Sequence, residues 1–491
     1  MSVIFVFFSL QHSKMIVLFH EVFLLLRSVI KWLQQKSSDE DHVDGGSSLQ
    51  QKNTDEDHIV AELFKQETVE QLESSPLNKN YIKEFSLLDK NDKTIDFPFF
   101  HDKDTISYIR KAKTMFIMRG VSGSGKSTLV KLICDVYKDV TVCSADQYFV
   151  KNGRYDFDHT QLSVAHDECN DKAKKACLNG VPVVVIDNTN VKRWEMTAYL
   201  DIAFRNNYPV IIVMPKTTWS NNPIKLAELN KHGVMADVIL NKLKSFEDVT
   251  PLYYGWFFNE KDSNLLYELG RNSLKECVQI YPQLKEMLLF LAPDHMFYFS
   301  DNLEQTLFDY FKLKRSTILH CTAKFMGTKR NPAENSEKYI NMDVVQRSYG
   351  SVHDLTVTRI TVTPRTIGVK VKLSEKCLQL YDKPEERDRG MKLKLQMGDN
   401  SLELEFGRSS HVTIGTAPDI PPVTTNDDLL DILDREVYCK MHNIPLPAHK
   451  CALGTVQHVL DDSFVVNLSQ PITMQGLFTG FYGGRFGSPR N

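Results

Sequence analysis

The sequence predicts two folded domains, a parallel α/β domain followed by an α+β domain with antiparallel strands. Length is the first reason, because 491 residues exceed what a single hydrophobic core usually supports. The second is a set of short, continuously apolar segments within residues 96–293, typical of strands buried on both faces. The third is a change near Asp294 to segments that alternate apolar and polar residues, as half-buried antiparallel strands do.

Composition indicates a soluble protein of ordinary globular usage, with 25% charged and 42% hydrophobic residues. The formal net charge of -3 gives no overall basic field, so any nucleic-acid contact must come from local patches. The nine cysteines form no C-x-x-C pair, which argues against a zinc site and a disulfide framework. We therefore expect a reducing compartment, the cytoplasm.

Residues 1–95 are expected to precede the folded domains. Val3–Leu10 and Met15–Leu26 are strongly apolar, but Lys14 and Glu21 interrupt them and no span of about 20 apolar residues results. A membrane-touching segment, an amphipathic extension and initiation at Met15 all remain open. Residues 33–42 then return, nearly unchanged, as residues 49–58, and this polar, acidic stretch is interpreted as a flexible linker.

The α/β domain is predicted over residues 96–293. Its expected strands are Met115–Met118, Val181–Ile186 and Pro209–Met214, with helical patterns after Ser127 and over Arg193–Arg205. Strands that alternate with helices in this way predict a parallel sheet.

A phosphate-binding loop follows the first of these strands. Residues 120–127 match the Walker A spacing in full, and they lie between an apolar strand and a predicted helix. Glycines let backbone N–H groups turn toward phosphate oxygens, while a lysine reaches the outer phosphates. The expected nucleotide-binding residues are Gly120, Ser122, Gly123, Ser124, Gly125, Lys126 and Ser127.

Two aspartates complete the predicted nucleotide site. Asp187 ends an apolar strand, where a carboxylate would hold Mg²⁺ together with the Ser127 hydroxyl, although a turn-capping role stays open. Asp146 follows the predicted strand that comes after the phosphate-binding loop. It is interpreted as a general base or a ligand of the substrate, with a helix N-cap as the alternative. We therefore expect ATP with Mg²⁺ in this domain.

The α+β domain is predicted over residues 294–484, with a tail over residues 485–491, and is expected to fold and work without the first domain. Its alternating segments are Thr317–Phe325, Leu355–Thr363, Gly368–Leu373 and Ser410–Gly415.

Two of these strands carry the same short motif, His320-Cys-Thr322 and His411-Val-Thr413. Because side chains alternate along a strand, each histidine shares a face with its threonine. In the first strand the opposite face is expected to hold Leu319, Cys321, Ala323 and Phe325; in the second, Val412 and Ile414.

Such a quartet suits the opening of a cyclic phosphate. A neutral histidine can take a proton from water while a protonated one gives a proton to the departing oxygen. The threonine hydroxyls can donate hydrogen bonds to the nonbridging phosphate oxygens. The predicted catalytic residues are therefore His320, Thr322, His411 and Thr413, and no metal is expected in this reaction.

The motifs resemble known families. Residues 120–127, 144–146 and 187–190 resemble the polynucleotide-kinase branch of P-loop proteins, with Lys192 and Arg193 as candidate lid residues. The two His-x-Thr motifs, with Phe325 after the first, resemble the two-lobed, two-histidine phosphoesterase superfamily. The order of both domains, together with residues 251–257, 362–365 and 477–483, resembles the 2′,3′-cyclic-nucleotide 3′-phosphodiesterase family.

This resemblance implies hydrolysis of 2′,3′-cyclic nucleotides to 2′-phosphates, with the first histidine as acid, the second as base, and Phe325 as a substrate contact. Two departures stand out. The family usually has a basic residue two before its second histidine, where this chain has Ser409 and Arg408 lies one further back. No C-terminal prenylation box is present, since the last cysteine is Cys451.

Two other readings remain. The chain could be a bifunctional RNA end-repair enzyme, both 5′-kinase and cyclic phosphodiesterase, or a scaffold that binds nucleotide or RNA. The candidate partners are 2′,3′-cyclic nucleotides, ATP, RNA, and a membrane or cytoskeletal surface.

Overall fold

The computed structural model describes residues 93–152, 154–291, 303–312, 318–328, 331–398, 403–460 and 462–483. The apolar segments and the repeated linker expected before residue 93, and the tail after residue 483, lie outside these ranges. None of the helices within them is long and apolar enough to cross a membrane.

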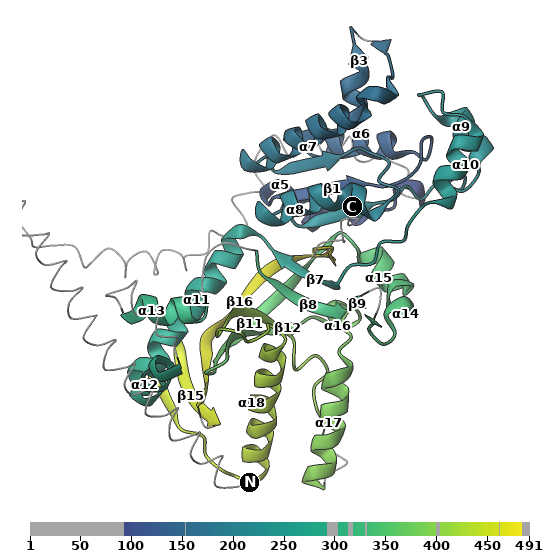
Figure 1. Cartoon of the computed structure of the whole chain (residues 1–491). Coiled ribbons are helices and arrows are strands. Elements are labelled where there is room, and N and C mark those ends of the chain that lie inside the picture. The colour runs from purple at the N-terminus through teal and green to yellow at the C-terminus, as the bar shows by residue number, and fades with distance from the viewer. Residues whose placement is uncertain are drawn as a thin grey trace, which may run out of the picture. The chain divides into compact units, whose positions relative to one another are not determined.

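The first domain is a four-stranded parallel sheet between helices (Figure 1). The strand order is β2-β5-β1-β6, and the central β1 is buried along its whole length. Its strands are β1 (Thr114–Met118), β2 (Val140–Cys143), β5 (Val183–Ile186) and β6 (Val210–Val213), with a small ribbon of β3 (Val150–Lys151) and β4 (Arg154–Tyr155). Continuously apolar strands are therefore buried on both faces, as expected.

Helices cover this sheet and build its core. Phe99, Phe116 and Ile133 are fully buried on one side of it, and Ile117, Cys143 and Ala173 lie in the core on the other. The helices are α4 (Pro98–His101), α5 (Lys103–Lys111), α6 (Lys126–Val136), α7 (Leu162–Leu178), α8 (Thr197–Arg205), α9 (Pro223–Leu229) and α10 (Ala236–Lys244).

The second domain is built on an eight-stranded antiparallel sheet of order β11-β12-β13-β8-β7-β16-β15-β14. Pairing of β11 with β16 closes part of this sheet into a barrel. Its strands are β7 (Tyr253–Phe258), β8 (His320–Phe325), β11 (Ser351–Val362), β12 (Thr366–Leu373), β13 (His411–Thr416), β14 (Ala448–Cys451), β15 (Gly454–Leu460) and β16 (Ser463–Phe481), with the short pair β9 (Gly327–Thr328) and β10 (Asn331–Pro332) beside it. The expected class, parallel α/β followed by α+β, is confirmed.

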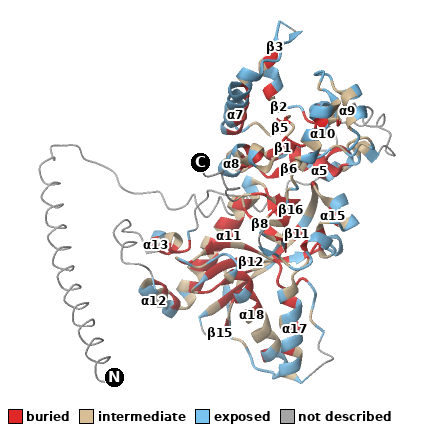
Figure 2. Ribbon diagram, turned by 45° about the vertical axis from the view of Figure 1, so that its right-hand side comes forward, coloured by how far each residue is buried: buried red, intermediate tan, exposed pale blue. Residues whose placement is uncertain are grey.

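Helices surround the barrel, and the buried residues gather in its strands and in the inner faces of α11 and α18 (Figure 2). These helices are α11 (Glu260–Ile280), α12 (Pro282–Leu291), α13 (Leu303–Tyr310), α14 (Ser336–Ile340), α15 (Asp343–Ser348), α16 (Glu375–Leu378), α17 (Pro384–Met397) and α18 (Thr424–Met441).

The expected domain boundary at residue 294 is wrong. Strand β7 and helix α11 both precede it, yet β7 pairs with β8 on one side and β16 on the other. Residues 253–258 are aromatic except for Gly255 and form a largely buried strand, so they lack the alternation that was used to find the second domain. This domain therefore begins near residue 250.

Main-chain and side-chain contacts join the described parts of the two domains. The hydroxyl of Tyr108 donates to the carbonyl of Phe257 at 3.1 Å, and that of Thr479 donates to the carbonyl of Val210 at 2.6 Å. Leu477 of β16 is buried in the core of the first domain's sheet. The second domain is thus packed against the first along β7 and β16.

Candidate active site

The two motif strands are neighbours in the barrel. Strand β13 runs antiparallel to β8 with Val412 opposite Cys321, and both side chains are fully buried. In this register His411 lies across from Thr322, and Thr413 lies across from His320. All four polar side chains therefore share the face opposite the core, as expected.

The ring of His411 is oriented by its own strand. Its Nδ1 lies 2.7 Å from the carbonyl oxygen of Ser409. A carbonyl oxygen can only accept, so Nδ1 carries the proton and Nε2 keeps a lone pair. The geometry thus prepares Nε2 of His411 to accept a proton.

The ring of His320 is held by aromatic stacking on β7. Tyr253 stacks on it with centroids 4.6 Å apart and an interplanar angle of 17°, and Phe257 lies 5.3 Å away. The residue between them is Gly255, where a Cβ atom would come within 2.5 Å of the Cys321 carbonyl oxygen. Strand β7 can therefore approach β8 closely enough for this stacking.

Both imidazoles are neutral in the free protein at neutral pH. Burial, and after it the nearby charge of Lys383, lowers the pKa of His320 to about 4. Burial and then Lys383 likewise lower the pKa of His411, to about 3. An imidazole that is to act as an acid must therefore gain its proton when a negative charge enters the site.

Phe325 does not lie on the core face as expected. The register between β7 and β8 shifts at Ala323, which forms a bulge, so Ala323 and Lys324 are both buried and Phe325 is 53% exposed. Phe325 then pairs with Tyr253, the residue that stacks on His320. The bulge moves Phe325 onto the face of the quartet, where a substrate base could contact it.

The phosphate loop connects β1 to α6 as expected. Gly123 has φ 81° and Gly125 has φ 103°, and a Cβ atom on Gly123 would lie 2.2 Å from the Leu226 carbonyl oxygen. Ser122 and Gly123 form the turn, and the buried Oγ of Ser124 has no partner among the described residues. A left-handed backbone with an unused donor is suited to an anion.

The charged residues of this loop converge. Lys126 folds back over the loop, with Nζ 3.1 Å from the Val121 carbonyl oxygen. Burial raises the pKa of Asp187, and the charge of Lys126 acts against this rise. The hydroxyl of Ser127 lies close enough to the Asp187 carboxylate to lower its pKa slightly. Ser127 and Asp187, which were predicted as the Mg²⁺ ligands, are thus brought together.

Asp146 lies beside the same loop, in a short helical turn over residues 145–149. Its carboxylate accepts from the hydroxyl of Tyr155 at 3.3 Å and lies 3.6 Å from Nε2 of His232. The expected lid residues Lys192 and Arg193 are instead engaged with Glu247 and Asp248, respectively. His232, not an arginine, therefore faces the candidate base.

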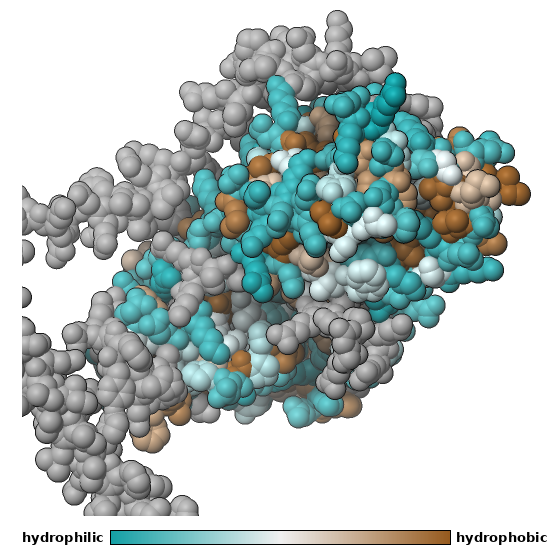
Figure 3. Space-filling view, turned by 45° about the horizontal axis from the view of Figure 1, so that its top comes forward, coloured by the Kyte–Doolittle hydropathy of each residue, from teal (hydrophilic) through white to brown (hydrophobic). Residues whose placement is uncertain are grey.

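Sequence reasoning missed the segment over residues 217–219, which donates hydrogen bonds to the phosphate loop. The indole of Trp219 donates to the Gly123 carbonyl at 3.2 Å, and Thr217 donates to the Ser124 carbonyl at 3.1 Å. Helices α9 and α10 continue this segment and expose apolar side chains such as Ile224 and Met235. Figure 3 shows apolar residues gathered where these helices lie, on an otherwise hydrophilic face.

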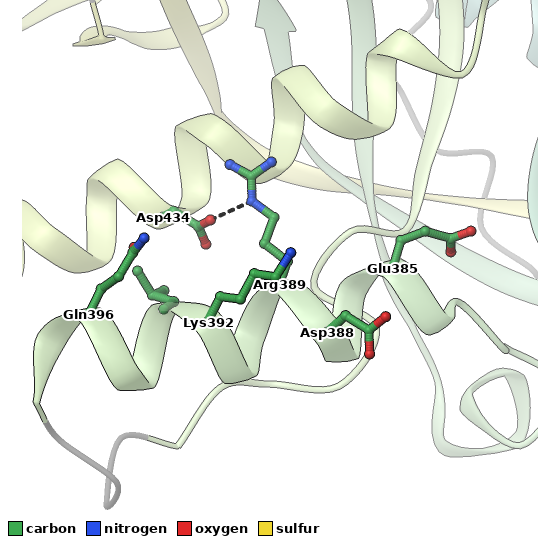
Figure 4. A pocket seen from close by; sticks show the side chains of 7 residues that line it. Glu385, Asp388, Arg389, Lys392, Gln396 and Asp434 are labelled. Atoms are coloured by element: carbon green, nitrogen blue, oxygen red, sulfur yellow. Dashed lines mark hydrogen bonds and ion pairs between the residues drawn. The ribbon is translucent and has the colours of Figure 1, made fainter.

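A groove between α17 and α18 belongs to neither site. Arg389 reaches from α17 to Asp434 on α18, and the rest of the groove is lined by charged side chains together with Leu393 and Gln396 (Figure 4). Arg408, the basic residue nearest in sequence to the second motif, also pairs with Asp434, at 2.8 Å. This pairing keeps its guanidinium on the α18 side of the barrel.

Comparisons with known proteins match each of the two domains. Residues 250–490 match the family described as 2′,3′-cyclic nucleotide 3′-phosphodiesterase, and residues 115–248 match an AAA domain. The mouse protein named 2′,3′-cyclic-nucleotide 3′-phosphodiesterase is 34% identical over 393 residues, which cover 79% of this chain and 87% of that protein. This chain belongs to the 2′,3′-cyclic-nucleotide 3′-phosphodiesterase family. The predicted family and enzyme class are confirmed.

Other relatives agree with this division. The rat 2′,3′-cyclic-nucleotide 3′-phosphodiesterase is 33% identical, over 83% of this chain and 92% of its own length. Human NEDD4-binding protein 2 is 33% identical over 148 residues, which are 29% of this chain and 8% of that protein. The phosphodiesterase family thus accounts for both described domains, with the boundary near residue 250.

Proposed function

We propose that this chain hydrolyses 2′,3′-cyclic nucleotides, or RNA ends that carry a 2′,3′-cyclic phosphate, to 2′-phosphates by acid–base catalysis with His411 and His320. The observation that carries the proposal is the antiparallel register of β8 and β13, which gathers two histidines and two threonines on one face. Membership in the phosphodiesterase family supports the same reaction.

In the proposed reaction Nε2 of His411 takes a proton from water as the water oxygen attacks phosphorus. The bond between phosphorus and the ribose 3′ oxygen breaks, and His320 gives its proton to that oxygen. The product carries a 2′-phosphate and a free 3′ hydroxyl. Thr322 and Thr413 donate hydrogen bonds to the nonbridging oxygens, where negative charge accumulates.

Each histidine is suited to its role. The Nδ1 proton of His411 is committed to the Ser409 carbonyl, which favours a neutral ring with an available lone pair. His320 has no such carbonyl partner among the described residues and is held by stacked rings, so both nitrogens can change protonation without breaking a hydrogen bond. This difference supports His411 as base and His320 as acid.

We also propose that the first domain binds ATP with Mg²⁺. The left-handed glycines, the unpaired Ser124 hydroxyl and the contact between Ser127 and Asp187 support this role. Mg²⁺, when bound, would shield the charge of the phosphates, and Lys126 would meet the outer phosphate oxygens. Asp146 beside this loop favours the bifunctional kinase as the second candidate function, with Asp146 as the base for a 5′ hydroxyl.

The hydrolysis is tested with His320→Ala and His411→Ala in the full chain, assayed with 2′,3′-cyclic NADP. Each variant is expected to lose about 10²-fold or more in kcat/KM, since a positioned acid or base contributes 10²–10⁴-fold. EDTA should leave wild-type turnover unchanged, because no step uses a metal. Near-wild-type turnover of either variant, or inhibition by EDTA, would contradict the scheme.

A further inference from the structure

The quartet holds no permanent positive charge, although its substrate is an anion throughout the reaction. Both imidazoles are neutral in the free protein, and the two hydroxyls are uncharged. A phosphodiester that gains charge in the transition state is usually stabilised by a cation as well as by neutral donors. A nearby lysine or arginine is therefore worth seeking among the described residues.

Two nearby cations are already engaged elsewhere. Lys370 lies across from His411, but its Nζ donates to the Val371 carbonyl at 2.8 Å and lies 3.3 Å from both the Gly407 carbonyl and the Ser410 hydroxyl. Arg408 is buried against Asp434. Neither ammonium nor guanidinium can reach the quartet without giving up these contacts.

Lys383 is placed beside the first motif by the residue before it. The backbone N–H of Asp382 donates to the Ala323 carbonyl at 3.0 Å, one residue after Thr322. The Asp382 carboxylate pairs with the buried ammonium of Lys324 at 2.8 Å. These contacts hold the chain that leads to Lys383 against strand β8.

A second set of hydrogen bonds ties the same segment to the second motif. The buried carboxylate of Glu386, three residues after Lys383, accepts from the backbone N–H groups of Gly407 and Ser409 at 2.7 and 2.9 Å. The Ser409 carbonyl in turn orients His411. Lys383 therefore stands at the start of α17, on a segment that is hydrogen-bonded to β8 and to the residues just before β13.

The Lys383 side chain is partly buried, and none of the described residues accepts a hydrogen bond from its Nζ. Its charge acts on both imidazoles, since after burial it is the largest influence on each pKa. A lysine on a segment that is hydrogen-bonded to both motif strands, with no acceptor for its Nζ among the described residues, has the place and charge of an anion ligand.

We propose that the Lys383 ammonium binds a nonbridging oxygen of the cyclic phosphate and stabilises the charge that this oxygen gains in the transition state. The proposal rests on the proposed two-histidine reaction. Burial lowers the pKa of Lys383 in the free protein, and the negative charge of the bound phosphate favours its protonated form. No bond to the Lys383 nitrogen forms or breaks. The substrate's negative charge offsets the lysine charge, which lets His320 take up the proton that it later donates.

The test compares Lys383→Met, Lys383→Arg and the control Lys392→Met in the full chain. Lys392 is an exposed lysine of the same helix, so its replacement removes equal charge away from the quartet. With 2′,3′-cyclic NADP, Lys383→Met is expected to lose about 10²-fold in kcat/KM, while Lys383→Arg stays within about tenfold of the wild type. Lys392→Met should be unchanged.

Two further readouts separate a catalytic role from a structural one. Removing the lysine charge favours the charged imidazoles, so the alkaline limb of the kcat/KM profile should move to higher pH in Lys383→Met. Inhibition by inorganic phosphate should weaken in parallel. If Lys383→Met lowers the Tm by more than about 5 °C, Lys383→Gln, which is neutral but polar, is measured in its place.

Comparing the lysine variants with the histidine variants distinguishes failure of the lysine proposal from failure of the two-histidine reaction. If both histidine variants are inactive while the neutral lysine variant keeps wild-type kcat/KM and an unmoved alkaline limb, the lysine proposal is overturned and the two-histidine reaction stands. If the histidine variants are active, the reaction itself is wrong. A loss of activity shared by Lys392→Met would also overturn the proposal, since the effect would then be general.

Discussion

The two phosphate sites of this protein are built from different parts of the chain. The loop over residues 120–127 offers backbone N–H groups at the start of α6, and its shape depends on left-handed glycines. The quartet offers side chains from β8 and β13, and its shape depends on strand register. The first site is local in sequence and the second is not, so each should fail in a different way when the protein is altered.

The largest effect is expected from removing β7. A chain that begins at residue 294 lacks the strand between β8 and β16, and it also lacks the rings that stack on His320. We expect no cooperative thermal unfolding and no phosphodiesterase activity, because the barrel would be open and β8 and β16 would each have one unpaired edge. A chain that begins near residue 245 is the control and should keep the barrel. Cooperative unfolding with activity in the shorter chain would refute this account of the site.

A change in the phosphate-binding loop should weaken nucleotide binding without affecting the phosphodiesterase site. Lys126→Ala removes the charge that meets the outer phosphates and leaves only backbone donors, so the Kd for ATP is expected to rise by about 10- to 10²-fold. Phosphodiesterase kcat should be unchanged. The matched control is Lys131→Ala, on the exposed face of the same helix. Isothermal titration with ATP and turnover of the same preparations check both halves, and a parallel fall in kcat would show that the sites are coupled.

The burial of the two histidines should be visible in the pH profile of the phosphodiesterase. Burial and Lys383 lower the pKa of His320 to about 4 and of His411 to about 3, so the free protein loses the protonated acid as pH rises above these values. Because kcat/KM reports the free enzyme, its optimum should lie below the ordinary histidine pKa of about 6.5. Bound phosphate raises both pKa values, so the optimum of kcat should lie at higher pH than that of kcat/KM. Coincident optima at or above neutral pH would contradict this electrostatic picture.

The smallest effect concerns the contact that joins the two regions. Tyr108→Phe removes the donor to the buried Phe257 carbonyl, on the strand that stacks against His320. The free energy of unfolding is expected to fall by about 1 kcal/mol, the usual net value of such a bond. Phosphodiesterase kcat should change less than twofold. A larger fall in kcat at unchanged stability would indicate that the first domain helps to position the acid.

Sequence patterns predicted the phosphate-binding loop well and the histidine–threonine quartet in part. The glycine spacing located residues 120–127, and the structure places Ser127 against Asp187 as expected. Alternation also predicted which face each histidine occupies. It could not reveal the bulge at Ala323, because an extra residue in one strand is visible only against its partner, and Phe325 was therefore assigned to the wrong face.

Other parts of the quartet's surroundings left little signal. Strand β7 has no polar residue in alternate positions and was assigned to the preceding domain. Its aromatic residues at positions 253 and 257 share one face and could have indicated a stacking surface. Lys383 lies in a charged segment that looks like solvent-exposed helix. Only the hydrogen bonds of Asp382 and Glu386 show that this segment is anchored to both motif strands.

The long strand β16 has a consequence for biosynthesis. It pairs with β7, β11 and β15, its Leu477 is buried in one core of the first domain, and Tyr482, just after the strand, is buried in the other. A ribosome delivers residues 463–481 after every other described strand has been made, so the barrel cannot close during translation of its earlier strands. Nascent β7 and β11 then carry open edges that invite pairing with other chains. Chaperone dependence should therefore be concentrated in the last stage of synthesis, when the histidine strands already exist but their barrel is still open.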